Sequence, residues 1–446
     1  MLIYNLLYIG IHMINIGICG LGTVGQSTLE HIVKFKNEIR SNVSIDFKVS
    51  HVADLEIKSK KLSNLDVAIV ENAMDLVKNP DISIIIELIG GTTAAYEVIT
   101  ESIKNGKHVI TANKALIAQH GDEIFKLAKE SKTFFGFEAS VAGAIPIIKA
   151  LTESMSNEKI FSVFGIINGT CNYILDQMST KKIDFETALT KAQELGYAEA
   201  DPSFDIGGND AAHKIAILSS LIYKIPLAYK ETYIEGIKNI SSMDIKYADE
   251  LGYVIKHIGV TKESDNLVES RVHPMLVPKD NILSQVHDVM NAVLVKGERF
   301  GSSMFYGHGA GGDATASAVV ANLVEAINFD QGIDKTNQKV VESIGTQNKK
   351  IKNIDEIETP FYLRIHAEDV SGVMAEITNI LALEKISIEA VTQHEPIDTD
   401  SLIPIVMITN SIQKKAITSA IKKIENLTHV KQKVYSIRVL QFDEKQ

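Results

Sequence analysis

Cysteine is scarce in this sequence, and its 45 basic residues are outnumbered by 56 acidic ones. The only two cysteines among its 446 residues, Cys19 and Cys171, lie far apart in the sequence, so they offer no structural zinc set and are typical of a reduced, cytoplasmic protein. The formal net charge is −11. Because affinity for nucleic-acid backbones depends on clustered lysine and arginine, this balance argues against a nucleic-acid partner. At this length we expect two or three domains.

Charged residues are absent before Glu30. Such a segment superficially resembles a signal peptide or a membrane span, but it has no basic n-region and no small-residue cleavage site. It also runs into a glycine loop that requires a tight turn. We therefore interpret residues 1–12 as a short apolar extension that is dispensable for folding and precedes a strand starting after Met13. No other stretch has the length and apolarity of a membrane span, so we expect no membrane partner.

Arginine is absent between Arg40 and Arg271. The middle of the chain therefore lacks the bidentate clamp expected for a substrate anchored as a 2-hydroxy acid. The same region contains Glu199, Asp205 and Asp210, and carboxylates of this kind are suited to hold an ammonium group. The pattern favours an amino-acid substrate whose reacting oxygen meets a lysine.

Residues 196–214, GYAEADPSFDIGGNDAAHK, combine acids with one lysine that opens an apolar run. Asp210 and Lys214 are four residues apart, so a helix would place them on one face. That face continues through Ile217 and Leu221, toward packed protein. A lysine held there can have its pKa tuned and can pass a proton to a substrate oxygen. On this segment alone, a solvated helix start with a surface ion pair explains the pattern equally well.

Strand-like and helix-like segments alternate through residues 13–147. We expect strands at 14–19, 44–53, 82–88 and 108–111, and helices from the glycine loop to about 39, at 94–105 and around 121–131. Nearly continuous apolar strands alternating with helices predict an α/β fold, a Rossmann-type doubly wound parallel sheet. We assign residues 305–330, with the glycine-dense YGHGAGGD and a helix at 314–327, to the same domain.

The rest of the chain predicts two further modules. Residues 148–304 read as a mixed α/β domain for substrate and catalysis, with strands at 161–167, 267–277 and 292–298 and helices at 187–195 and 211–222. A polar, lysine-rich linker is expected at 331–359. The last module, 360–442, predicts the order strand, loop, helix, strand, strand, helix, strand.

A glycine motif, Gly20-x-Gly22-x-x-Gly25, follows the first predicted strand and opens a helix. In that context the glycines allow a tight turn, close approach of the backbone to a pyrophosphate, and close packing of helix on strand. Asp54, at the end of the second strand, is the candidate ribose partner and favours NAD. Four basic side chains could instead receive a 2′-phosphate: His51, Lys58, Lys60 and Lys61. The choice between NAD and NADP stays open.

Two more loops follow predicted strands and should reach the same sheet edge, where open α/β folds bind ligands. They are Gly90-Gly91-Thr92-Thr93 and Thr111-Ala-Asn113-Lys114. Lys114 would bring a cation close to the nicotinamide. The alternative is a lysine that only caps a loop.

The loop Phe137–Pro146, FEASVAGAIP, combines one acid, Glu138, with small residues. A carboxylate with backbone carbonyls is the ligand chemistry of a hard cation. A metal site is therefore one interpretation of this loop.

Seven stretches in family order resemble homoserine dehydrogenase. They are GICGLGTVG, GGTTAAYEVI, GKHVITANKALI, FEASVAGAIPII, GIINGTCNYIL, GYAEADPSFDIGGNDAAHK and YGHGAGGDATASAV, from residue 17 to about 320. The resemblance implies reversible reduction of L-aspartate 4-semialdehyde to L-homoserine with NADH or NADPH, a step toward threonine, isoleucine and methionine. The chain has no aspartate-kinase segment, which implies the monofunctional form.

The resemblance also implies roles for individual residues. Lys214 corresponds to the catalytic proton donor, with Lys114 as a second lysine near the reacting oxygen. Glu199 and Asp210 correspond to the acids that bind homoserine, and Asp205 supports them. Further residues resemble cofactor contacts: Thr23, Val24, Thr92, Gly196 and the loop from Gly309 to Gly311. Glu138 and the carbonyls of Val141, Gly143 and Ile145 resemble the family's sodium site.

The third module resembles an ACT domain, with HAEDVSGVMAEI after its first strand and EAVTQHE, residues 389–395, as its second strand. Such domains typically bind small amino acids at paired interfaces. The resemblance therefore implies feedback inhibition by L-threonine, and a homodimer or homotetramer is expected over a monomer. A module that serves only dimerisation is the alternative.

Two other functions compete with this reading. A phosphorylating semialdehyde dehydrogenase would use Cys171 as its nucleophile. A regulator that senses dinucleotide and amino acid would bind cofactor without turnover, but it would have no need for the proton-transferring lysine.

Overall fold

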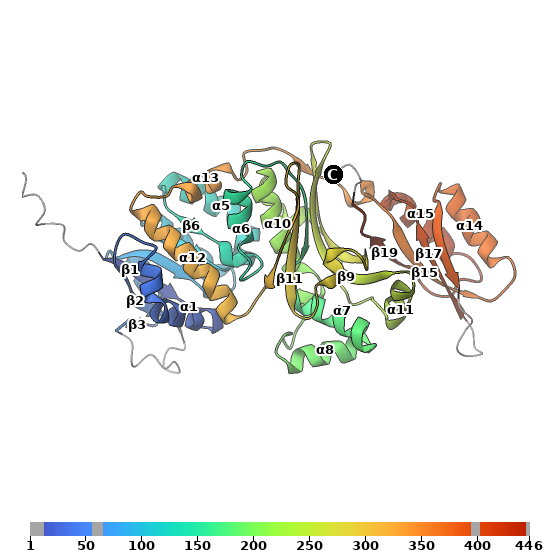
Figure 1. The fold of residues 1–446 in the computed structure, drawn as a ribbon, viewed down its shortest axis with the longest axis horizontal. Helices are drawn as coiled ribbons and strands as arrows, with labels where there is room; N and C mark the ends of the chain where they lie inside the picture. The colour runs from blue at the N-terminus through green and yellow to red at the C-terminus, as the bar shows by residue number, and fades with distance from the viewer. Residues whose placement is uncertain (1–12, 56–65, 394–401, 443–446) are drawn as a thin grey trace, which may run out of the picture. The chain divides into compact units, whose positions relative to one another are not determined.

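The computed structural model describes residues 13–55, 66–393 and 402–442 (Figure 1). The proposed extension at residues 1–12 and the basic residues Lys58, Lys60 and Lys61 lie outside the described residues. The chain forms two compact units. The first unit comprises Met1–Glu158, Ala216–Lys230 and Phe305–Lys349, and the second comprises Lys159–Ile215, Glu231–Met304 and Lys350–Gln446. The predicted boundaries of the domains stay predictions.

The first unit is built on a six-stranded parallel sheet in the order β3-β2-β1-β4-β5-β6. Its strands are β1 (Ile14–Cys19), β2 (Phe47–Ala53), β3 (Ala68–Val70), β4 (Ile82–Glu87), β5 (His108–Thr111) and β6 (Phe135–Gly136). The strand order reverses between β1 and β4, which confirms the predicted doubly wound sheet and places its ligand-binding crevice at that reversal.

Helices surround this sheet. They are α1 (Thr23–Lys34), α2 (Lys36–Arg40), α3 (Ala73–Lys78), α4 (Thr93–Lys104), α5 (Lys114–Ser131), α6 (Ile147–Lys149), α12 (Gly312–Asp330) and α13 (Thr336–Ser343), with short turns η2 (Glu138–Ser140) and η3 (Ala150–Ser154). Helix α12 packs beside α1, and Val319 and Leu323 join Leu29 and Ile32 in one buried apolar cluster. Residues 305–349 thus belong to the same unit as the glycine loop.

Three predictions in this unit need correction. The first helix does not continue to residue 39, because Phe35 leaves helical geometry at φ −107°, ψ 27° and separates α1 from α2. Helix α5 begins at Lys114 rather than near Gly121, since the Asn113 side chain accepts a hydrogen bond from the Leu116 N–H (3.0 Å) and caps the helix. The expected linker carries helix α13.

The second unit contains one long mixed sheet, in which the strand order runs β11-β7-β9-β10-β19-β15-β17-β16. The strands of this sheet within the unit are β7 (Ile160–Ile166), β8 (Tyr233–Ile234), β9 (Tyr253–Ser264), β10 (Leu267–Pro278), β11 (Met290–Gly297), β13 (Lys350–Ile351), β15 (Phe361–Glu368), β16 (Ile388–Gln393), β17 (Leu402–Thr409) and β19 (Tyr435–Val439). Strands β14 (Glu358–Thr359) and β18 (Ile412–Gln413) pair with each other in a separate sheet, and β12 (Gly301–His308) begins in this unit and ends in the first. Helix α7 and strand β9 were not predicted.

The helices of this part are α7 (Gly169–Lys181), α8 (Phe185–Glu194), α9 (Ser203–Ile206), α10 (Asn209–Tyr223), α11 (Ser242–Glu250), α14 (Val373–Leu383) and α15 (Lys414–Glu425), with turns η4 (Tyr229–Glu231), η5 (Ile282–Gln285) and η6 (Ile354–Glu356). The C-terminal module has the predicted order of strands and helices. Its last strand, β19, pairs in parallel with β10 through Met275–Arg438 and Leu276–Val439, so the C-terminal module and the preceding domain share one sheet.

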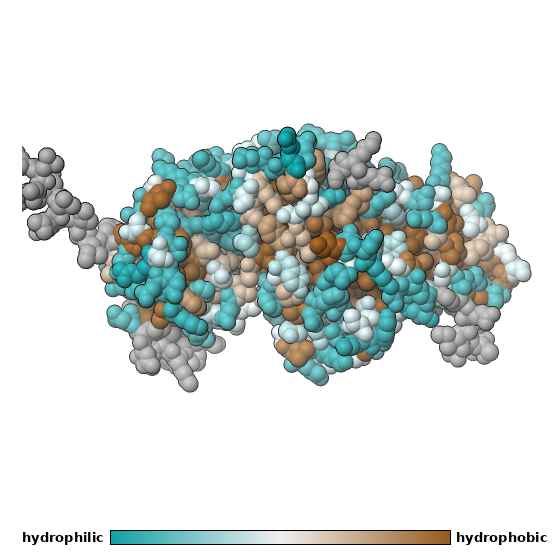
Figure 2. All heavy atoms as spheres, viewed as in Figure 1, coloured by the Kyte–Doolittle hydropathy of each residue, from teal (hydrophilic) through white to brown (hydrophobic). Residues whose placement is uncertain are grey.

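Buried contacts reinforce that junction. Asp244 of α11 is fully buried and receives a bidentate ion pair from Arg364 of β15 (2.7 and 3.1 Å) and the Tyr362 hydroxyl (3.0 Å). Figure 2 shows hydrophilic residues over most of the visible face, interrupted by small apolar areas. Across the described part of the chain, no helix has both the length and the apolarity that crossing a membrane requires.

Candidate active site

The glycine loop lies between β1 and α1, as predicted. Gly20 has φ +94°, and a Cβ atom there would lie 2.5 Å from the Leu88 carbonyl oxygen. A Cβ atom on Gly25 would lie 2.0 Å from the Gly20 carbonyl oxygen. Gly22 differs, since a Cβ atom there would meet no protein atom within 4 Å. The open space beside Gly22 leaves room for a pyrophosphate to approach the backbone at the start of α1.

Asp54 contacts the loop directly, because its Oδ2 accepts a hydrogen bond from the Leu21 N–H at 2.6 Å. The carboxylate is thus fixed beside the glycine loop, and Thr23 and Val24 open the helix that follows. His51, one of the alternative phosphate partners, lies within hydrogen-bonding distance of the side chains of Ser50 and Asn79. Cofactor preference stays an open prediction.

The two other loops at this edge are tied together by Glu87, which was not predicted as a site residue. Its buried carboxylate accepts hydrogen bonds from the Thr111 hydroxyl (2.7 Å) and the Ile89 N–H (2.8 Å). Burial raises the pKa of Glu87 above its ordinary value. Asn113 links the loops again by donating from its side chain to the Gly91 carbonyl (2.6 Å). The only signal in the sequence was a single acid at the end of an apolar strand.

Lys114 is the first residue of α5, and Thr92 immediately precedes α4. The helix dipole disfavours a cation in the first turn by about 0.3–1 kcal/mol. The two interpretations of Lys114, a functional lysine near the nicotinamide or one that only caps a loop, both stay predictions.

The segment that precedes α12 packs against the loop FEASVAGAIP. Gly311 has φ +114° at the start of α12. A Cβ atom on Gly143 (φ +53°) would lie 2.6 Å from the Gly309 carbonyl carbon, and the Ala144 N–H donates to the His308 carbonyl at 3.0 Å. Gly309 and Gly311 thus belong to a strand-to-helix turn in the same unit as the glycine loop of β1 and α1.

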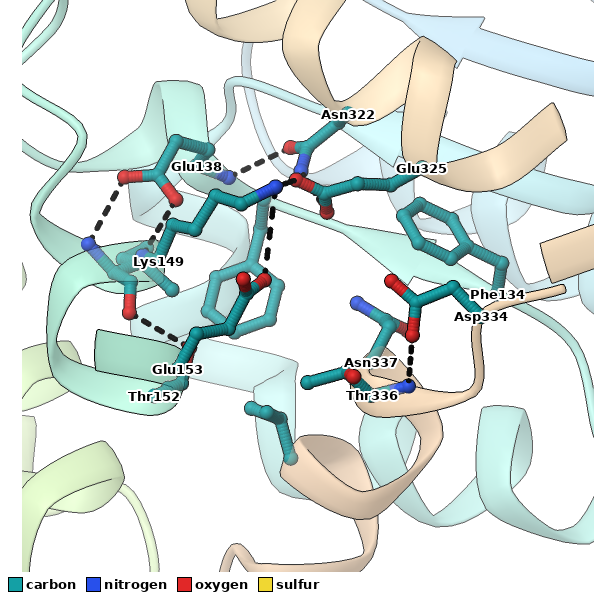
Figure 3. A pocket seen from close by; sticks show the side chains of 13 residues that line it. Phe134, Glu138, Lys149, Thr152, Glu153, Asn322, Glu325, Asp334, Thr336 and Asn337 are labelled. Atoms are coloured by element: carbon teal, nitrogen blue, oxygen red, sulfur yellow. Dashed lines mark hydrogen bonds and ion pairs between the residues drawn. The ribbon is translucent and has the colours of Figure 1, made fainter. Parts of the chain in front are cut away.

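Glu138 is buried and uses both carboxylate oxygens within the protein. They accept hydrogen bonds from the N–H groups of Ile148 (2.9 Å) and Lys149 (2.8 Å), at the start of α6. Figure 3 shows this arrangement, with the Lys149 ammonium reaching Glu325 at 2.6 Å beside a cavity of about 30 Å³. Burial raises the pKa of Glu138 to about 7. The side chain therefore stabilises the loop.

A cation at this loop would have to be held mainly by backbone oxygens. The candidates from the sequence are the carbonyls of Val141, Gly143 and Ile145, and Ala142 and Gly143 both have positive φ (58° and 53°). The described residues contain no group of three or more histidine, cysteine or acidic side chains that could hold a metal. Carbonyl ligands suit a hard monovalent ion. The sodium hypothesis stays a prediction.

The second unit contains the acid–lysine pair. Lys214 and Asp210 of α10 are 6% and 5% exposed, and the Lys214 ammonium donates to Asp210 Oδ2 (2.8 Å) and to the Ile167 carbonyl (2.7 Å). The two side chains share one helix face, as predicted. Their burial rules out a solvated surface pair.

Asn168, between β7 and α7, connects this pair to a third predicted residue. Its side-chain N–H₂ donates to Asp205 Oδ1 and to Asp210 Oδ2, both at 2.8 Å. Asp205 lies in α9 and is partly buried. The structure thus brings together Asp205, Asp210 and Lys214, through an asparagine that the sequence analysis did not single out.

Two further predicted residues of the segment 196–214 precede this network in the chain. Glu199 and Gly196 are exposed on the connection between α8 and α9, and Gly196 has φ +74°. Asp201 accepts a hydrogen bond from the Ser203 N–H at 3.1 Å. Asp201 therefore supports a turn, whereas the predicted role of Glu199 stays a prediction.

Cys171 is fully buried in α7. Its Sγ donates to the Asp205 carbonyl at 3.2 Å, and burial raises the pKa of the thiol well above its usual value. A nucleophilic cysteine needs a stabilised thiolate. This geometry argues against the phosphorylating dehydrogenase.

Comparison with known proteins identifies the family of the chain. A family model described as "Homoserine dehydrogenase, NAD binding domain" matches residues 20–138, one described as "Homoserine dehydrogenase" matches 146–324, and an ACT domain model matches 361–426. A homoserine dehydrogenase of Pseudomonas aeruginosa is 42% identical over 432 residues, covering 96% of this chain and 99% of the relative.

Solved structures give the same result. The crystal structure of a homoserine dehydrogenase from Thiobacillus denitrificans superposes with a TM-score of 0.91 at 40% identity, covering 96% of this chain and 98% of that one. A hyperthermophilic archaeal homoserine dehydrogenase in complex with NADPH has a TM-score of 0.59 at 28% identity, covering 70% of this chain and 97% of that one.

Proposed function

This chain belongs to the homoserine dehydrogenase family, and we propose that it reduces L-aspartate 4-semialdehyde reversibly to L-homoserine, on the route to threonine, methionine and isoleucine. Family membership makes it an NAD(P)-dependent oxidoreductase that acts on a CH–OH group. The observation that carries the proposal is the buried Asp210–Lys214 pair.

Lys214 is the proposed proton donor. Its ammonium is fixed by two oxygen acceptors, Asp210 Oδ2 and the Ile167 carbonyl, and the adjacent carboxylate favours its protonated form. A bound nicotinamide cofactor would supply the hydride to the aldehyde carbon. Lys214 would then protonate the oxygen on which negative charge develops, so the protein orients the reactants and stabilises that charge.

The other predicted residues take supporting roles in this proposal. Asp210 and the exposed Glu199 bind the substrate ammonium, and Asp205 steadies the site. Lys114 lies near the reacting oxygen and the cofactor. The cofactor contacts are those of the glycine loop (Gly20, Gly22, Thr23, Val24 and Gly25) together with Asp54, Thr92, Lys114, Gly196, Gly309 and Gly311.

Regulation and assembly also belong to the proposal. The ACT module is proposed to bind L-threonine and to inhibit the enzyme, and the chain is proposed to form a homodimer or homotetramer in the cytoplasm. A monovalent cation, sodium, is proposed at the FEASVAGAIP loop. The support for this cation is a turn of small residues whose backbone carbonyls are the available ligands, while Glu138 holds α6.

A homoserine oxidation assay with NAD and NADP in parallel, with and without L-threonine, tests the proposal. We expect reduced cofactor to form only when L-homoserine is present, and the rate to fall with threonine. Cofactor binding without turnover would support the sensor instead. Rates with sodium replaced by a bulky organic cation would test the cation separately.

A further inference from the structure

Asn168 occupies a junction between the strand and the helix that flank the acid–lysine pair. It is separated from the end of β7 by one residue, is 5% exposed, and is the N-cap of α7, where its Oδ1 accepts a hydrogen bond from the Cys171 N–H at 2.8 Å. Its Nδ2 donates to Asp205 Oδ1 and Asp210 Oδ2, both at 2.8 Å. Every hydrogen-bonding atom of this amide therefore has a partner.

These partners fix the orientation of the amide. A reversed amide would place its N–H₂ group against the Cys171 N–H and its carbonyl oxygen against two carboxylates. Both arrangements are repulsive, so only the observed orientation satisfies the site. The amide thus acts as a rigid spacer between Asp205 and Asp210.

The spacing matters because the two carboxylates carry like charge and one of them also holds Lys214. Asp210 Oδ2 accepts from both Asn168 Nδ2 and Lys214 Nζ, each at 2.8 Å. Lys214 is anchored in turn on the carbonyl of Ile167, the residue before Asn168. The two residues after β7 therefore position all three groups. The Ile167 carbonyl holds Lys214, and the Asn168 side chain holds both acids.

We infer that Asn168 is a positioning residue of the proposed reaction, which holds the carboxylates of Asp205 and Asp210 at a fixed separation beside Lys214. This inference rests on the proposed function. Asp205 then belongs to the network that orients Lys214, to which it is linked through Asn168 and Asp210. Other titratable groups facing the acids are Cys171 of α7 and His257 of β9, and burial keeps both uncharged by raising the pKa of the thiol and lowering that of the imidazole to about 4.

Two substitutions separate positioning from helix capping. Asn168→Ser keeps an oxygen for the Cys171 N–H but loses the two-pronged donor. Asn168→Asp keeps the shape and the cap but replaces the donor with a third carboxyl group. Asp184→Ala is the matched control, because Asp184 caps α8 of the same unit through the Thr187 N–H at 2.8 Å and lies outside the network.

The readout is the pH profile of kcat and kcat/KM for homoserine oxidation, with thermal unfolding of each variant. Hydrogen-bond donation to a carboxylate lowers its pKa, so loss of the donor should move the acid limb of kcat/KM upward by about one pH unit in Asn168→Ser. We expect kcat to fall about tenfold or more. Asn168→Asp should shift the limb further, and Asp184→Ala should lose only thermal stability.

Profiles of both Asn168 variants that superpose on the wild type, in protein that melts cooperatively, would overturn the inference. The same holds if activity falls equally at every pH, since that is the signature of a merely structural cap. Should Asn168→Ser not fold, Asn168→Asp still gives the profile because it retains the cap. A wild-type protein without homoserine turnover is a different result, and it refutes the proposed function itself.

Discussion

The cofactor edge of the first unit and the acid–lysine network of the second are each organised by one buried polar side chain, but the two side chains have opposite chemistry. The Glu87 carboxyl accepts hydrogen bonds from a hydroxyl and from a backbone N–H. The Asn168 amide donates hydrogen bonds to two carboxylates. A buried carboxyl group that only accepts is tolerated where its partners are neutral donors of loops. A neutral hub is needed where the partners are acids that must stay available for an ammonium group.

The largest expected effect breaks the network of the second unit. Replacing Lys214 with alanine should lower kcat by about two orders of magnitude or more, because no other residue of this network can donate the proton. Affinity for the cofactor, measured by fluorescence titration, should stay unchanged. Lys191→Ala, an exposed lysine of α8, is the control. Near-normal turnover of Lys214→Ala would remove this lysine from the mechanism.

A substitution at Gly22 tests the cofactor edge in the same way. A Cβ atom there would meet no protein atom within 4 Å, so we expect Gly22→Val to fold and to occupy the space assigned to the pyrophosphate. We expect the KM for the cofactor to rise about tenfold or more, a loss of about 1.4 kcal/mol, with the melting temperature unchanged. Gly25→Ala should instead impair folding, since its Cβ atom clashes with the loop. An unchanged cofactor KM in Gly22→Val would contradict the assignment.

Replacing Glu87 of the first unit should change the free energy of unfolding. Glu87→Gln leaves a mismatched donor in a buried site and should cost about 1–3 kcal/mol in the free energy of unfolding. Because burial raises the pKa of Glu87 in the folded state, its contribution to stability is full below the ordinary carboxyl pKa and falls as pH rises through the raised value. The difference in the free energy of unfolding between wild type and Glu87→Gln should therefore decrease as the pH rises.

Denaturant unfolding at several pH values measures this difference. Glu97→Gln, at an exposed position on α4, serves as the control and should give a difference independent of pH. If the difference in unfolding free energy between wild type and Glu87→Gln does not change with pH, Glu87 has the same pKa in the folded and unfolded states, which contradicts the prediction.

The smallest expected effect concerns Cys171. Its thiol donates to the Asp205 carbonyl, and a serine hydroxyl can make the same bond. Cys171→Ser should therefore change kcat by less than about twofold. Complete loss of activity in a folded variant would revive the cysteine-nucleophile alternative.

The sequence was most informative where local pattern and function coincide. The bounds of β1 and β5 were predicted correctly, and so was the shared face of Asp210 and Lys214. Apolar strands and four-residue spacing act over a few positions, so no distant contact is needed to predict them.

The errors and omissions have a different physical origin. Gly121 suggested a helix start, but it lies inside α5, where it makes room for the Leu227 side chain, since a Cβ atom there would lie 2.3 Å from it. Asn168 and Glu87 were missed because their partners lie far along the chain, 37 and 42 residues from Asn168 and 24 from Glu87. Tertiary contacts decided each of these cases, and one sequence does not reveal them.

The pairing of β19 with β10 has a consequence for biosynthesis. Residues 435–439 are translated more than 150 residues after β10, yet they pair with that strand at Met275 and Leu276. Until then the free edge of β10 is a template for mispairing with another nascent chain. A stop codon that removes only the final strand should therefore yield insoluble protein, even though every residue proposed for catalysis has already been translated.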